Sequence, residues 1–130
     1  MNIIKKKQIK LDKNDEQATR LFAKLGMSKN LAKTIMYLSH VDECYSADIE
    51  WGAKLRQPEV SLIMNELSQR GWITKREQKN KGKGRPLYAY KSTKNLSEII
   101  KEVEYNKLRE IENVKENISQ LKDIKNLIPK

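Results

Sequence analysis

The last quarter of this 130-residue sequence, residues 97–128, contains neither glycine nor proline, and this feature limits the fold more than any other. Apolar side chains recur there every three to five residues, at Ile100, Val103, Leu108, Ile111, Val114, Ile118, Leu121, Ile124 and Ile128. That spacing predicts one long helix. At about 1.5 Å per residue the helix would span roughly 48 Å, longer than the rest of so small a domain, so part of its apolar stripe should lack an intramolecular partner.

We expect the uncovered part of this stripe to pair with the same helix of a second copy, which would make the protein a homodimer. The residues predicted at that interface are Leu108, Ile111, Val114, Ile118 and Leu121. The last four keep strict heptad spacing, which is typical of a coiled coil, but the flanking seam positions Lys107 and Lys125 are charged. A continuous coiled coil therefore stays open, and the alternative is a helix folded back on its own domain.

Glycine and proline residues divide the chain before this helix into shorter elements. Residues 15–25 are predicted to form a first helix that ends at Gly26. Ser28 caps a second helix, residues 41–43 then turn the chain, and Ser46 caps a third helix. The apolar residues expected in the core from this part of the chain are Ala18, Leu21, Phe22, Leu25, Leu31, Ile35, Leu38, Ile49, Ala53 and Leu55.

A fourth helix is predicted over residues 58–70. Pro58 suits its first position, where the missing N–H is not needed, and Gly71 supplies a left-handed closing residue. Trp72 should pack back on this helix. The positions expected to face the core share one arc of about 100°, and they are Val60, Ile63, Met64 and Leu67.

The pattern then changes to two short β-prone runs, residues 72–77 and 87–91, on either side of a polar loop with two glycines. We predict a β-hairpin with a long basic tip. Residues 75–94 carry eight basic side chains against one acidic, a net charge of +7, whereas residues 1–14, 15–74 and 95–130 carry +4, −1 and 0. Such a concentration favours a polyanionic partner, most commonly nucleic acid, and the alternative is a solvated lysine run that reflects overall composition.

This order of elements predicts a mainly α, α+β fold, a winged helix-turn-helix with a two-stranded β-wing and a long C-terminal helix for dimerisation. The helix at 58–70 would enter the major groove of double-stranded DNA. Amides can bond adenine and an apolar side chain can contact the thymine methyl, so an A·T-containing site is favoured; an ordinary polar helix surface is the alternative. The residues predicted to read bases are Gln57, Ser61, Leu62, Asn65 and Gln69.

Phosphate contacts are expected from basic residues in and near the hairpin. They are Arg56, Lys75, Arg76, Lys79, Lys81, Lys83, Arg85 and Lys91. Arg85 stands between Gly84 and Pro86, a tripeptide that looks like the core of an AT-hook and suits a narrow minor groove, although a plain hairpin turn is as good an explanation. The amino-terminal lysines are expected either to form a second phosphate-contacting arm or to be disordered, and they are Lys5, Lys6, Lys7, Lys10 and Lys13.

Several of these motifs together resemble archaeal winged-helix transcriptional regulators related to the TrmB and MarR groups, over residues 15–92. The motifs are Leu55-Arg56-Gln57-Pro58-Glu59-Val60-Ser61, Met64, Glu66-Leu67, Arg70-Gly71-Trp72-Ile73, Gly82-Lys83-Gly84-Arg85-Pro86 and Tyr90. The resemblance implies homodimers that bind a two-fold DNA site and repress or activate promoters. Carried over by position, base reading falls to Gln57, Ser61, Leu62 and Asn65, and wing contacts fall to Lys83 and Arg85.

The chain departs from the pattern of that group at two positions. Lys54 stands where many relatives have glycine in the turn, and Leu62 stands where MarR-type recognition helices often carry arginine. The resemblance supplies no effector site. We expect three parts, a basic N-terminal arm (1–14), a winged helix-turn-helix DNA-binding domain (15–94) and a C-terminal dimerisation helix (95–130).

Other function classes receive little support from the sequence. A single cysteine, Cys44, and a single histidine, His40, rule out an internal disulfide and most metal sites. Ser39, His40 and Asp42 are neighbours in the chain, but a helix would turn them apart, so we predict no enzyme. We expect no cofactor, no metal, no evident small-molecule ligand, no membrane contact and a cytoplasmic location.

Two alternatives to a sequence-specific regulator stay open. One is a winged-helix component of the transcription machinery, and the other is a non-specific architectural DNA-binding protein. Sequence preference in DNA binding would separate both from a regulator.

Overall fold

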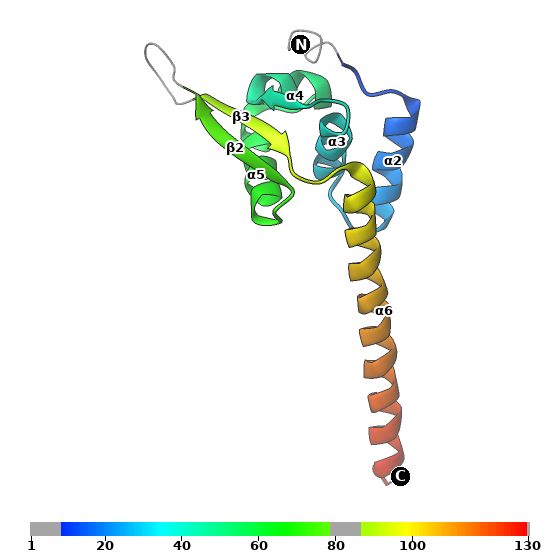
Figure 1. Cartoon of the computed structure of the whole chain (residues 1–130). Coiled ribbons are helices and arrows are strands. Elements are labelled where there is room, and N and C mark those ends of the chain that lie inside the picture. Colours follow the sequence, from blue (N-terminus) through cyan, green and yellow to red (C-terminus); the bar gives the residue numbers. More distant parts are fainter. Residues whose placement is uncertain (1–8, 79–86, 130) are drawn as a thin grey trace. The chain divides into compact units, whose positions relative to one another are not determined.

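The computed structural model describes residues 9–78 and 87–129 (Figure 1). The elements, in chain order, are α2 (Lys13–Lys24), α3 (Lys29–Leu38), β1 (Glu43–Tyr45), α4 (Ser46–Ala53), α5 (Gln57–Gln69), β2 (Ile73–Gln78), β3 (Leu87–Ser92) and α6 (Leu96–Leu127). The chain divides into two compact units, Met1–Leu96 and Ser97–Lys130, and each is described by itself. Among the described residues, no helix combines the length and the apolar character that crossing a membrane requires.

The buried face of α2 differs from the prediction. Of the residues predicted to lie in the core, Phe22 is buried, but Leu21 and Leu25 are 52% and 45% exposed. Asp15 and Thr19 are buried in their place. Around the axis of α2, the centre of the buried face lies about 80° from the position that the apolar residues alone predict. The cause is that two polar residues are satisfied inside the fold and can therefore occupy buried positions.

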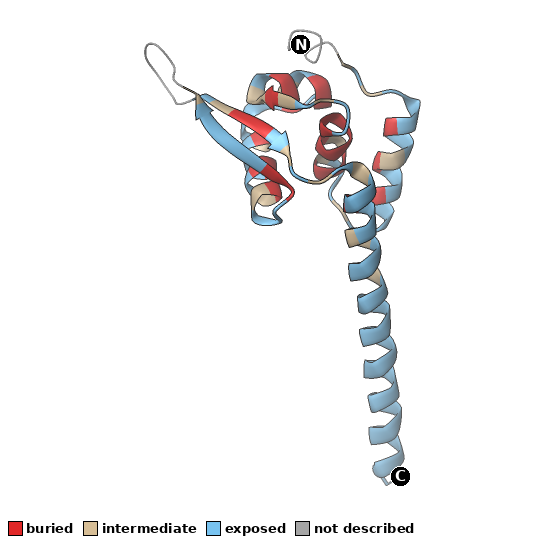
Figure 2. Cartoon of the chain, in the orientation of Figure 1, coloured by how far each residue is buried: buried red, intermediate tan, exposed pale blue. Residues whose placement is uncertain are grey.

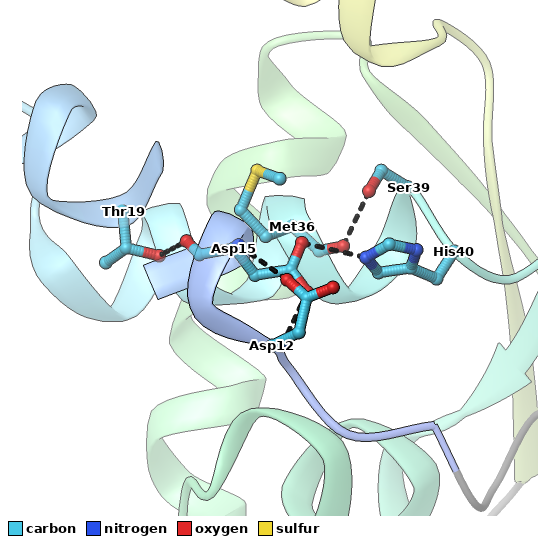
Figure 3. Close-up of polar contacts among 6 residues, drawn as sticks. All are labelled: Asp12, Asp15, Thr19, Met36, Ser39 and His40. Atoms are coloured by element: carbon cyan, nitrogen blue, oxygen red, sulfur yellow. Dashed lines mark hydrogen bonds and ion pairs between the residues drawn. The ribbon is translucent and has the colours of Figure 1, made fainter. Parts of the chain in front are cut away.

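Figure 3 shows the polar contacts that satisfy the buried Asp15. Asp15 and Asp12 cap α2 reciprocally, since each carboxylate accepts the other residue's backbone N–H at 2.9 Å. The Thr19 hydroxyl donates to the Asp15 carbonyl at 2.9 Å. His40 Nε2 lies 2.8 Å from Asp15 Oδ1. The last contact ties the start of α2 to the residues that follow α3.

The helix-turn-helix consists of α4 and α5. The Tyr45 N–H donates to Asp48 Oδ2 at 2.9 Å, so α4 is capped one residue before Ser46, the predicted cap. Likewise α5 begins at Gln57, one residue before the predicted start at Pro58. Between them Lys54 has φ 57° and ψ 55°, the left-handed conformation that glycine adopts most easily. The turn forms with lysine in place of glycine.

The C-terminal end of α5 agrees with the prediction. Gly71 has φ 78°, its N–H donates to the Ser68 carbonyl at 3.0 Å, and the Trp72 N–H donates to the Leu67 carbonyl at 3.0 Å. These two bonds are those of a Schellman motif. The four apolar residues predicted to face the core, Val60, Ile63, Met64 and Leu67, are all buried, as is Trp72.

The sheet has three antiparallel strands in the order β1-β3-β2, so the predicted two-stranded wing is incomplete. The hairpin of β2 and β3 is confirmed, with Thr74 opposite Lys91. The third strand, β1, pairs Cys44 with Tyr90 and includes Glu43, which was predicted to lie in a turn. A strand of three residues is too short to show a period of two, and only its pairing with β3 defines it.

The core of the first unit lies among α3, α4, α5 and the sheet, where Figure 2 shows most of the buried residues. Tyr37, Ile49 and Ala53 have no exposed surface. Gly52 permits a close approach of α4 to α3, because a Cβ at this position would collide with the Tyr37 ring. The second unit is the long helix α6, which matches the predicted span to within one residue at each end.

Candidate nucleic-acid interface

The exposed face of α5 contains the five residues predicted to read bases, Gln57, Ser61, Leu62, Asn65 and Gln69, together with Pro58. At 100° per residue they occupy a continuous arc of about 140° opposite the buried stripe. Leu62 is 73% exposed near one edge of this arc. The helix therefore presents three amides, one hydroxyl and two aliphatic side chains to the outside.

Contacts at both ends hold α5 in place. At its start, the carboxylate of Glu59 accepts the Arg56 backbone N–H at 2.8 Å and the Asn30 side-chain amide at 3.4 Å, which links α5 to α3. At its end, the Thr93 hydroxyl donates to the Gly71 carbonyl at 2.6 Å. The exposed face is thus carried by a helix that is fixed to its neighbours before any ligand binds.

Both carboxylates of α5 lie outside the exposed face and are already engaged. Glu59 makes the contacts given above, and Glu66 forms an ion pair with Arg70 at 2.8 Å. The Arg70 guanidinium also lies 5.0 Å from the centre of the Trp72 ring. An uncompensated carboxylate would repel phosphate, and the exposed face of α5 contains none.

The described basic residues of the wing lie on both faces of the hairpin. Adjacent residues of a strand point to opposite faces, so Lys75 and Arg76 diverge. The Lys75 ammonium lies 4.6 Å from the centre of the Tyr88 ring. Lys91 is exposed and shares the face of Arg76. The remaining predicted wing contacts, Lys79, Lys81, Lys83 and Arg85, are outside the described residues, as are the predicted arm lysines Lys5, Lys6 and Lys7.

Arg76 has a carboxylate partner that the sequence did not predict. Its Nε and a terminal nitrogen contact the two oxygens of Glu43 at 3.0 and 3.1 Å, a bidentate ion pair between β2 and β1. Hydrogen bonding to Glu43 raises the pKa of Arg76. Nothing local in the sequence links the two residues, because the contact depends on the unpredicted strand β1. Arg56, in contrast, is exposed at the N-cap of α5.

The predicted dimer residues form one apolar stripe along α6. Leu108, Ile111, Val114, Ile118 and Leu121 are between 47% and 65% exposed. Ion pairs flank them, Lys107 with Glu110 at 3.1 Å and Lys115 with Glu112 at 3.8 Å. Within its own unit, the helix gives these five side chains no covering surface.

No model of a known protein family matches the sequence, and no curated protein matches it significantly. Solved structures do match. The archaeal chromatin protein TrmBL2 has a TM-score of 0.56 at 15% identity, over 88% of this chain and 43% of its own. NadR, solved in complex with 4-hydroxyphenylacetate, has a TM-score of 0.50 at 15% identity, over 86% of this chain and 79% of its own.

A MarR family transcription regulator, SP03579, matches with a TM-score of 0.47 at 16% identity, over 88% of this chain and 73% of its own. The similarity to TrmBL2 and NadR is one of fold. Together with the order of elements described above, it identifies the first unit of this chain as a winged helix-turn-helix.

Proposed function

We propose that this protein is a sequence-specific DNA-binding transcriptional regulator that acts as a homodimer at promoters. The observation that carries the proposal is the make-up of the exposed face of α5, where five side chains able to contact base edges stand together without a carboxylate. In a winged helix-turn-helix this helix enters the major groove. Asn65, Gln57 and Gln69 offer the amides that pair with adenine, and Leu62 offers contact with a thymine methyl, so the operator should contain A·T pairs.

The wing supplies the part of the binding that does not depend on sequence. Lys75 and Lys91 are exposed on opposite faces of the hairpin, and the sequence between its two strands contains four further basic residues. Phosphate contacts of this kind give affinity and registration on the duplex. Arg76 should contribute less than its position suggests, because Glu43 already occupies one edge of its guanidinium and neutralises its charge.

The stripe of α6 supports a homodimer. Five apolar side chains in line, each about half exposed, are costly in water and can be buried by a second α6. Residues 95–130 have no net charge, so two such helices would not repel each other. The division predicted from the sequence assigns residues 1–14 to a basic arm, 15–94 to DNA binding and 95–130 to dimerisation, and the last two residues of that arm belong to α2.

The first experiment is selection of bound duplexes from a random DNA pool at near-physiological salt, followed by sequencing. A dimeric regulator should enrich an inverted repeat with half-sites about one helical turn apart. Asn65→Ala should then lower affinity for the selected site by about 1–3 kcal/mol and relax preference at one or two base pairs. Asn113→Ala, the same substitution outside the stripe of α6, is the matched control and should change neither.

An architectural DNA-binding protein is the second candidate function. The concentration of basic residues in the wing and the description of TrmBL2 as a chromatin protein favour it. The same selection separates the two functions, since an architectural protein would bind in a salt-sensitive manner without enriching any sequence. If the Asn65→Ala variant enriches the same DNA sequence as strongly as the wild-type chain does, the assignment of α5 as the helix that reads bases is contradicted.

A further inference from the structure

A cavity of about 750 Å³ opens among α2, α3 and α4 of the first unit, and neither the wing nor the exposed face of α5 contributes to it. Its volume is within the range of small-molecule sites. Its walls come from four segments of the chain, and the lining residues that matter here are Lys29, Lys33, Lys54, Trp51, Glu16 and Glu50.

The charge of the cavity is strongly positive. Five of its lining residues are basic and two are acidic. Over residues 9–78 and 87–129, none of these seven side chains forms an ion pair. Burial lowers the pKa of Lys33, repulsion from Lys29 and Lys54 lowers it further, and attraction to Glu59 raises it in part. Lys33 is half-buried, whereas Lys29 and Lys54 are exposed beside it, so three positive charges on one side of the cavity offer a binding site for more than one negative charge.

One wall of the cavity is aromatic. Trp51 is 47% exposed, an unusual position for a side chain of this size, and the Lys10 ammonium lies 5.8 Å from the centre of its ring. A half-exposed indole is a platform on which a second aromatic ring can stack, on the face that Lys10 does not cover. The other tryptophan, Trp72, is buried in the core.

The cavity is held in shape by the packing beneath it. Gly52, next to Trp51, lies against the Tyr37 ring so closely that any larger residue would collide with it. This contact fixes α4, and with it Trp51 and Lys54, relative to α3, which carries Lys29 and Lys33. The backbone positions that carry the aromatic wall and the lysine cluster are therefore fixed with respect to each other, while the exposed side chains can adjust to a ligand.

We propose that this cavity binds a free nucleotide, whose base stacks on Trp51 and whose phosphates lie among Lys29, Lys33 and Lys54. A nucleotide combines the three properties that the lining demands: a planar ring for the indole, several negative charges for the lysines, and amino or hydroxyl groups that can donate to Glu16 and Glu50. A simple carboxylate would use one lysine and leave the others repelling each other. The proposal does not depend on the DNA-binding function.

The test is calorimetric titration of the full chain with ATP, AMP and inorganic phosphate. We expect saturable binding of ATP at one site per chain, with a dissociation constant below about 1 mM, accompanied by a change in tryptophan fluorescence. Lys33→Ala and Trp51→Ala should each weaken ATP binding about tenfold or more. Lys24→Ala removes the same charge from an exposed position on α2 outside the cavity and should change affinity less than about twofold.

A second pair of measurements separates the roles of the indole. Trp51→Phe keeps a ring for stacking, so ATP binding should persist within about threefold while the fluorescence change disappears. Circular dichroism of each variant checks that it is folded. Lys29→Ala provides an independent test of the lysine cluster if Lys33→Ala does not fold.

Four results would overturn the proposal. They are absence of saturable ATP binding, phosphate binding as tight as ATP binding, equal losses in Lys24→Ala and Lys33→Ala, and full ATP affinity in Trp51→Ala. Equally tight phosphate binding would mean that the cavity is a simple anion site. Equal losses in Lys24→Ala and Lys33→Ala would mean that ATP is attracted by the overall positive charge of the protein. If Lys33→Ala weakens duplex binding while ATP does not bind, the cavity belongs to the DNA interface and the nucleotide site is rejected.

Discussion

The helices α5 and α6 are both amphipathic, but opposite sides of them are exposed. In α5 the apolar stripe is buried and the opposite face, polar except for Leu62 and Pro58, is open, whereas in α6 the apolar stripe itself is about half exposed. An apolar stripe at helical spacing therefore indicates a core face in α5 and a candidate interface in α6. Where the apolar side is covered by the helix's own unit, the polar side can hold a binding site; where it is not covered, the apolar side is the candidate interface.

The largest effect that this contrast predicts is on stability. Leu67→Ala should lower the free energy of unfolding by about 3 kcal/mol, because a fully buried leucine leaves a cavity when it is truncated. Leu121→Ala, the same substitution at an exposed position of α6, should lower it by less than about 1 kcal/mol in dilute protein. Urea unfolding followed by circular dichroism measures both. Equal losses would break the comparison between the two helices.

The next largest effect concerns association. Ile118→Asp should raise the dimer dissociation constant at least a hundredfold, about 2.7 kcal/mol, since a charge in an apolar helix interface loses hydration without a partner. Asn113→Asp adds the same charge to α6 outside the stripe and should leave association nearly unchanged. Sedimentation over a range of concentrations gives the constants. A wild-type chain that stays monomeric at every concentration would remove the homodimer altogether.

A smaller effect is expected at the wing, where Arg76 is paired with Glu43 and Lys91 is exposed. Glu43→Gln should release Arg76 from its ion pair and raise affinity for non-specific duplex DNA severalfold at low salt. The slope of the logarithm of the binding constant against the logarithm of the salt concentration should become steeper by about one. Lys91→Ala should shift the salt dependence in the opposite direction by a similar amount. Binding titrations at several salt concentrations measure the slopes. If Glu43→Gln and Arg76→Ala each leave the slope unchanged, this arginine has no part in binding.

The smallest effect is on pH dependence. The backbone N–H of Asp15 bonds to Asp12 and lowers the pKa of Asp12 below its ordinary value of 3.8. The folded state therefore gains stability from this group above that value, and the gain is lost as the pH falls through the lower pKa of the folded protein. Asp12→Asn, which keeps a side-chain acceptor at the cap, should flatten this part of the acid unfolding curve. An unchanged curve would assign acid sensitivity to other carboxylates.

The sequence predicted the elements that local chemistry defines. Gly71 and Pro58 bound α5 closely, and the absence of glycine and proline from residues 97–128 predicted α6 to within one residue at each end. The buried stripe of α5 and the hairpin were also predicted, because each depends on a period that can be counted within a short segment.

The elements that the sequence did not predict depend on contacts between distant residues. The strand β1 exists because Cys44 pairs with Tyr90, and the buried face of α2 lies where it does because Asp15 meets His40. The lysine-lined cavity is assembled from four segments, none of which shows a binding motif. The predicted DNA and dimer contacts stay predictions, since each concerns a partner outside the chain.

Lys54 occupies a backbone conformation that glycine adopts more easily, and this has a consequence for the evolution of the molecule. A left-handed conformation costs a non-glycine residue about 1 kcal/mol or more. Lys54→Gly would relieve this cost, but glycine adds conformational entropy to the unfolded chain, and the replacement would also remove one positive charge from the cavity wall. If the cavity binds a nucleotide as proposed, the turn between α4 and α5 is a position where backbone strain is kept for the sake of anion affinity.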